Sequence, residues 1–249
     1  MNETDYCAGL VVLTPEESKR VIAKGVVALP SVKHALETGK VIIATGSTNA
    51  FVAEELIGDV FDKEQFMTGN ISAGGFGPKA EPGLQPFVLE HGEVSDVPWQ
   101  QALEQFDADD VFIKGANAVD SEGFAGILIG HPTSGTIGEA YRAVVSKGAQ
   151  LVVPVGLEKM IPSVLDASRS YTGTRRVKYY AGARPAGFMP IVNAEVVTEI
   201  QALEHLFGVE VTHVASGGIR GSEGSVTLLI EGIEGDVRDC IGFVEQIKR

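Results

Sequence analysis

The stretch Val41-Ile42-Ile43-Ala44-Thr45-Gly46-Ser47-Thr48-Asn49 says more about the fold than any other part of this sequence. An apolar, β-branched run stops at a Gly-Ser-Thr-Asn turn, and a helical pattern begins at once, from Ala50. A glycine in such a turn lets a ligand approach the backbone, and the first amides of the new helix have no intrahelical partner, which favours an anion. The predicted ligand-binding residues are Gly46, Ser47, Thr48 and Asn49. The alternative is a turn whose Ser or Thr only caps the helix.

Strands alternate with helices on both sides of this stretch. Thr14-Pro15-Glu16-Glu17 is a capping box that opens a helix to about Lys24, and a helix at 31–38 ends at Gly39. Further strands are expected at 41–44, 85–89, 110–113, 126–129 and 151–155, and further helices from 50, at 99–105 and at 134–146. This alternation predicts, for residues 1–185, an α/β domain with a mostly parallel, Rossmann-like sheet and helices on both faces.

The pattern changes near the C-terminus. Residues 179–190 contain two prolines and two glycines, which is typical of a linker. Beyond them, strands are expected at 191–197, 209–214 and 225–230, and helices at 200–207 and 237–247, with a glycine-rich hairpin between the last two strands. Residues 186–249 are therefore predicted to form a small ferredoxin-like α+β domain, one strand short of the full count.

Composition narrows the classes of function. The 249 residues carry a net charge of −13, which argues against a nucleic-acid-binding surface. No apolar run reaches the ~18 residues of a membrane span, and the first ~10 residues do not resemble a signal peptide. Cys7 and Cys240 lie at opposite ends of the chain and fit a reducing compartment. We expect a cytoplasmic protein that contacts neither nucleic acid nor membrane, with no cofactor and no metal site.

A second polar turn follows the strand at 110–113. Lys114 ends an apolar run, where a charged side chain avoids burial unless it is paired, so it is a candidate for contact with a phosphate. Asn117 and Asp120 follow in the same turn and are candidate site residues. The alternatives are a solvent-facing lysine and a turn held by Asx-type hydrogen bonds.

A third polar turn opens the helix expected at 134–146. Ser134, Gly135 and Thr136 form a second helix N-terminus suited to an anion, with simple capping as the alternative. His131 precedes this turn, and Glu139 lies in the first helical turn, where a carboxylate also favours the helix dipole. In the glycine-rich loop at 72–78, the candidate ligand contacts are Gly74 and Gly75. A plain connecting loop is the alternative there.

Three of these segments, in order, resemble motifs of one superfamily. It includes ribose-5-phosphate isomerase A, glucosamine-6-phosphate deaminase, the DeoR-type sugar-sensing repressors and family I CoA transferases. Residues 44–48 are similar to the Gly-Thr-Gly-Ser-Thr phosphate loop of the isomerase, and residues 111–120 to the strand and Gly-Ala-Asp-x-x-Asp turn of isomerases and repressors. Residues 134–139 lie where the isomerase has a glycine-rich turn and a helix with a catalytic Glu. The resemblance covers about two-thirds of the chain, to about Ser163.

This resemblance implies a site for a phosphorylated sugar or a related anionic metabolite. If the chain is an isomerase, Glu139 is the implied base and Lys114 or His131 the electrophile, with Asp120 as the other remaining carboxylate. Lys114-Gly115-Ala116-Asn117 stands where the isomerase has Asp-Gly-Ala-Asp. That difference favours the alternative, a non-catalytic sensor that uses the same site. In that case the C-terminal module would pass on the signal or form a homodimer. CoA transfer ranks last, because no Glu-Asn-Gly signature is found.

Overall fold

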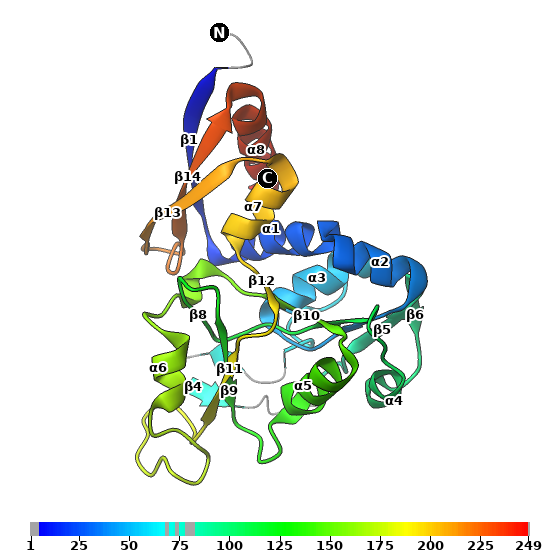
Figure 1. The fold of residues 1–249 in the computed structure, drawn as a ribbon. Coiled ribbons are helices and arrows are strands. Elements are labelled where there is room, and N and C mark those ends of the chain that lie inside the picture. Colours follow the sequence, from blue (N-terminus) through cyan, green and yellow to red (C-terminus); the bar gives the residue numbers. More distant parts are fainter. Residues whose placement is uncertain (1–4, 68–69, 73–74, 78–82, 249) are drawn as a thin grey trace.

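The computed structural model describes residues 5–67, 70–72, 75–77 and 83–248 (Figure 1). Its centre is a six-stranded sheet with the order β12-β10-β7-β2-β5-β6. The four strands that run parallel are β2 (Lys40–Ile43), β7 (Val111–Ile113), β10 (Gln150–Pro154) and β12 (Glu195–Val197). The antiparallel strands at one edge are β5 (Phe87–Glu90) and β6 (Glu93–Ser95). The prediction of a mixed α/β fold with a mostly parallel sheet is confirmed.

Helices cover both faces of this sheet (Figure 1). On one face lie α1 (Pro15–Ala28), α2 (Pro30–Thr38) and α3 (Ser47–Ile57), and on the other lie α4 (Trp99–Glu104) and α5 (Gly135–Lys147). Successive strand residues point to opposite faces, so Ile43 and Ile113 pack with the first group of helices, and Ile42 and Phe112 with the second. Burial on both sides explains why these strands read as unbroken apolar runs.

Helix α1 begins with the expected capping box. The Thr14 N–H donates to Glu17 at 2.8 Å, the Glu17 N–H donates to the Thr14 hydroxyl at 3.4 Å, and Pro15 occupies the first helical position. Thr14 and Glu17 thus bond reciprocally at the start of the helix, and the prediction made from these residues is confirmed.

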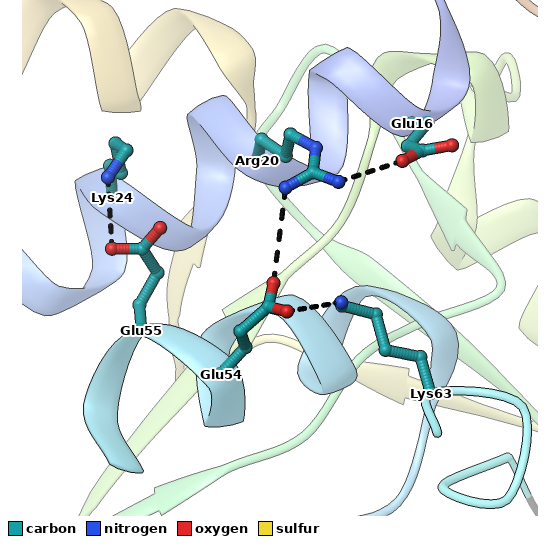
Figure 2. A network of polar contacts seen from close by, with 6 residues as sticks. All are labelled: Glu16, Arg20, Lys24, Glu54, Glu55 and Lys63. Carbon is teal, nitrogen blue, oxygen red and sulfur yellow. Dashed lines mark hydrogen bonds and ion pairs between the residues drawn. The ribbon is translucent and has the colours of Figure 1, made fainter. Parts of the chain in front are cut away.

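Ion pairs tie α1 to α3 (Figure 2). Arg20 lies between Glu16, at 2.9 Å, and Glu54, at 4.0 Å, while Lys63 makes a further ion pair with Glu54. Lys24 and Glu55 form another pair at 3.0 Å. These contacts hold α3, whose first turn carries residues 47–49, against the helix beside it.

A second, antiparallel sheet consists of strands from both ends of the chain. It has the order β1-β14-β13 and consists of β1 (Tyr6–Leu13), β13 (Glu210–Ser216) and β14 (Val226–Ile233), next to α7 (Glu199–Phe207) and α8 (Glu234–Ile247). The expected hairpin between β13 and β14 is present. Three pairings cross the boundary predicted at residue 185, because β1 pairs with β14, β12 with β10, and Gly187–Ile191 with Ala125–Ile129. The ferredoxin-like layout stays a prediction.

A third sheet, with the order β11-β9-β8, extends from the large one. It contains β8 (Ala118–Val119), β9 (Ala125–Ile129) and β11 (Gly187–Ile191). The linker prediction for 179–190 is wrong for its last four residues, because β11 pairs along the whole of β9. Pro190 is compatible with this strand because β9 is its only partner, so the missing N–H interrupts no second ladder.

The remaining elements are short. They are β3 (Asn70–Ser72), β4 (Gly75–Gly77), η1 (Leu157–Lys159) and α6 (Val164–Arg169). None of the helices within the described ranges has an apolar stretch of the length and hydropathy that crossing a bilayer requires.

Candidate functional site

The carboxyl ends of the four parallel strands meet at one edge of the large sheet. The turns that follow β2, β7, β10 and β12 comprise residues 45–49, 114–117, 155–159 and 198–199, and are together called the carboxyl edge below. The strand order reverses at β2, because the strand next in the sheet order on one side is β5, whereas the later strands β7, β10 and β12 lie on the other side. Ligands of open α/β sheets bind at the carboxyl edge beside such a reversal. The topology therefore selects the region around β2 and β7.

Asn49 lies between the ends of β2 and β7. Its Nδ2 donates to the carbonyl oxygen of Ala44 at 2.6 Å and to that of Ile113 at 3.2 Å. The side chain is fully buried, and its Oδ1 has no hydrogen-bond partner among the described residues. Gly115 lies beside this oxygen, since a Cβ added there would be 3.4 Å from it. A buried acceptor without a donor is unfavourable.

The first turn of α3 presents amides beside Asn49. The Gly46 N–H donates to Phe66 and the Ala50 N–H donates to Gly46, both at 2.9 Å. Between them, the amides of Ser47, Thr48 and Asn49 make no hydrogen bond with any described residue. Neither Ser47 nor Thr48 caps the helix, since no side-chain cap is present. The simple capping alternative for this turn is therefore wrong.

Two lysines lie together at the carboxyl edge. Lys114 follows β7, and its Nζ donates to the Gly115 carbonyl at 3.2 Å; the Nζ of Lys159, in η1, donates to the next carbonyl, that of Ala116, at 3.1 Å. Both side chains are partly buried. Within the described part of the chain, neither ammonium has an ion pair with a carboxylate closer than 4 Å. Lys114 is not the solvent-facing lysine of the alternative interpretation.

This arrangement changes the protonation of both lysines. Burial and the neighbouring charge of Lys159 lower the pKa of Lys114 to about 8. Burial also lowers the pKa of Lys159, but Glu158 and Glu199 oppose that effect.

Glu199, at the start of α7, is the buried acid of this edge. Its Oε2 accepts a hydrogen bond from the Leu157 N–H at 2.9 Å, and its Oε1 has no partner among the described residues. Burial raises its pKa, which favours the neutral acid. The sequence analysis missed Lys159 and Glu199. The available signal was the one used for Lys114, since each follows a buried strand within a few residues.

Asp120 and Asn117 hold the turns rather than face the carboxyl edge. The two oxygens of Asp120 accept from the amides of Glu122 at 3.1 Å, Phe124 at 3.0 Å and Val164 at 2.8 Å. Asn117 Oδ1 accepts from the Leu128 N–H at 3.0 Å. Asp120 matches the Asx-turn alternative, and its carboxylate anchors α6 to the β8–β9 turn, whereas Asn117 bonds an amide of β9.

The start of α5 is a separate polar turn. Because α5 runs antiparallel to β10, its N-terminus lies on the carboxyl side of the sheet (Figure 1). His131 is exposed, and its Nδ1 contacts the Thr133 hydroxyl at 2.9 Å. Ser134 has a left-handed φ of 64°, and its side chain does not cap the helix. No hydrogen bond or ion pair among the described residues joins His131, Ser134 or Glu139 to Lys114 or Asn49. Gly135 and Thr136 continue this turn into the helix.

The glycine-rich loop is described only in part. Gly74 lies outside the described residues, and Gly75 begins β4, which pairs with β3. Its predicted ligand contact stays a prediction.

The described residues hold no group of three His, Cys, Asp or Glu side chains that would bind a metal ion. Comparison with protein-family models, curated proteins and solved structures finds no match to this chain.

Proposed function

We propose that this protein binds a small anionic metabolite, with a phosphorylated sugar as the leading class, at the carboxyl edge between β2, β7 and β10. The observation that carries this proposal is the Lys114–Lys159 pair. Two partly buried cations without a carboxylate partner repel each other where the effective dielectric is low. An anion bound between them removes that repulsion and compensates for the desolvation of both ammonium groups.

The neighbouring groups indicate which anion fits. Lys114, Lys159 and the free amides of α3 are donors, and they match the acceptor oxygens of phosphate or carboxylate. The Oδ1 of Asn49 is a buried acceptor with no donor among the described residues, which a fully ionised phosphate cannot satisfy but a hydroxyl group can. A ligand with both an anionic group and hydroxyl groups would match the donors and the acceptor of this edge. Sugar phosphates and hydroxy acids are such ligands.

Two modes of action share this site. Isomerisation of the sugar would use Glu139 as base and Lys114 or His131 as electrophile, a set that is chemically possible but differs from that of ribose-5-phosphate isomerase A. A sensor without catalysis is the second candidate. The engagement of both Asp120 oxygens by backbone amides favours it, because that carboxylate is then not available for proton transfer.

The test is calorimetric titration of the full chain with ribose 5-phosphate, ribose and inorganic phosphate at pH 7. We expect ribose 5-phosphate to bind more tightly than phosphate, and ribose to bind far more weakly than both. Lys114→Met should weaken ribose 5-phosphate binding at least tenfold. The matched control is Lys33→Met, which removes an exposed lysine of α2 and should bind like the wild type. Equal affinity of the wild type and Lys114→Met would contradict the proposal. An isomerase assay with Glu139→Gln then separates enzyme from sensor.

A further inference from the structure

Lys114 differs from a lysine that only binds an anion. An ammonium that serves as a point charge is best kept fully protonated, and a carboxylate at hydrogen-bond distance would keep it so. Here the Nζ has only the Gly115 carbonyl as a described partner, and a second cation lies on the next carbonyl of the same turn. The pair thus creates an amine that gives up its proton readily at the edge of the sheet where ligands bind.

We propose that Lys114 is a nucleophile that forms an imine with the carbonyl group of an aldehyde or ketone that also carries an anionic group. Lys159 and the first turn of α3 hold that anionic group, so this inference rests on the proposed anion site and adds the chemistry of the bound compound. A lysine next to another cationic group is one of the known ways to activate an amine for this reaction.

The step balances with the groups present. The neutral Nζ of Lys114 attacks the carbonyl carbon, a C–N bond forms, and the carbonyl π pair becomes an alkoxide that takes a proton. We assign that proton to the ammonium of Lys159, whose Nζ donates to Ala116 beside Gly115, and the attacking nitrogen, now positively charged, returns a proton to the Lys159 amine. The resulting carbinolamine loses water, and the product is an imine between Lys114 and the substrate. No oxidant, reductant or metal takes part.

Lys114 differs from an exposed lysine in its protonation. Burial and the neighbouring charge of Lys159 lower its pKa to about 8, which gives a substantial share of neutral amine at pH 7.5. An ordinary lysine, with a pKa of about 10.4, is almost wholly protonated there.

Reductive trapping tests the inference. The full-length protein is incubated with glyoxylate, a small aldehyde with a carboxylate, and with cyanoborohydride, and the modified lysines are quantified by peptide mass mapping. We expect Lys114 to be labelled at least about tenfold faster than the exposed Lys33 at pH 7.5. The rate at Lys114 should be half-maximal near pH 8. Labelling of Lys114 no faster than that of Lys33 would overturn the inference.

Two variants separate nucleophilicity from anion binding. Lys159→Met removes the neighbouring cation, so with acetaldehyde, a neutral probe, the half-maximal pH at Lys114 should move upward and the rate at pH 7 should fall. A lysine that is merely accessible would keep the same profile. Lys33→Met removes an exposed lysine of α2, outside the carboxyl edge, and should leave the labelling profile of Lys114 unchanged.

The two proposals fail in different ways. If Lys114 is not labelled preferentially but Lys114→Met still loses ribose 5-phosphate, the imine is wrong and the anion site stands. If Lys114→Met also binds ribose 5-phosphate normally, both are wrong. Preferential labelling by glyoxylate that ribose 5-phosphate suppresses supports both.

Discussion

The cations around α1 and those of the carboxyl edge differ in their hydrogen-bond and ion-pair partners. Arg20 and Lys24 each meet a carboxylate of α3, and Lys63 shares Glu54 with Arg20 (Figure 2). Lys114 and Lys159 are partly buried, yet each ammonium bonds only a backbone carbonyl among the described residues. The chain contains 33 acidic residues, so acids for pairing are not scarce. The first group forms ion pairs, and our proposal is that the second is kept for an anion from outside.

The largest expected effect comes from Lys114→Met. The folded-state pKa of Lys114, about 8, lies below the ordinary 10.5, so the unfolded chain binds more protons between these values, and wild-type stability rises with pH across that window. Below pH 8 the buried ammonium destabilises the fold by up to about 3 kcal/mol. Lys114→Met should therefore unfold with a higher free energy at pH 7 and lose this pH dependence. Urea denaturation at several pH values checks this, and a less stable variant would show that the pair supports the fold.

Asp120→Ala should have the next largest effect, in the opposite direction. This change leaves the amides of Glu122, Phe124 and Val164 without their buried acceptor, and we expect a loss of about 2 kcal/mol in the free energy of unfolding. Ribose 5-phosphate affinity should stay within about twofold, because this carboxylate does not face the carboxyl edge. A tenfold loss of affinity in protein shown to be folded would place Asp120 in the site after all.

The pH dependence of anion binding sharpens the comparison further. Sulfate does not titrate above pH 7, so any change in its affinity comes from the protein. Affinity should be flat from pH 7 to 8 and then fall toward tenfold per pH unit, as Lys114 loses its proton near pH 8. Lys114→Arg should show no such decline, since arginine stays charged. Calorimetry across pH 7–10 measures both, and a wild-type profile as flat as that of the arginine variant would exclude Lys114 as the titrating group.

The smallest effect is expected from the paired cations. Glu54→Gln removes the carboxylate between Arg20 and Lys63, both of which are partly exposed. We expect a loss of only about 0.5 kcal/mol, which 1 M salt largely abolishes. Thermal unfolding at low and high salt measures this difference. A loss above about 2 kcal/mol would mean that paired and unpaired cations here are not energetically distinct.

Much of the fold could be predicted because local signals agreed with the tertiary structure. The capping box at Thr14–Glu17 and the apolar runs of β2 and β10 gave helix and strand positions that the structure confirms. The role of β1 could not be predicted, because its partner β14 lies more than 200 residues further along the chain and no local pattern encodes that pairing. β11 was missed since its glycine and proline resemble those of a linker.

The location of some candidate site residues could be predicted for the same reason. Gly46–Asn49 and Lys114 follow buried strands, and parallel strands bring such turns to one edge. The sequence did not show that Asp120 is fully bonded to backbone amides, because an Asx turn and a catalytic carboxylate look alike before the chain is folded. Nor did it show that Lys159 bonds the turn that follows Lys114. That contact depends on how η1 places the Lys159 side chain at the Ala116 carbonyl.

The central claim is that Lys114 is held unpaired for an anion, at a loss of stability. The most direct measurement is the free energy of unfolding of the wild type and Lys114→Met, with and without ribose 5-phosphate at about 100 times its dissociation constant. Without ligand, the variant should be the more stable protein. The ligand should add about 2.7 kcal/mol to the wild type and little to the variant, so the gap should close. A gap that ribose 5-phosphate leaves unchanged would contradict the claim.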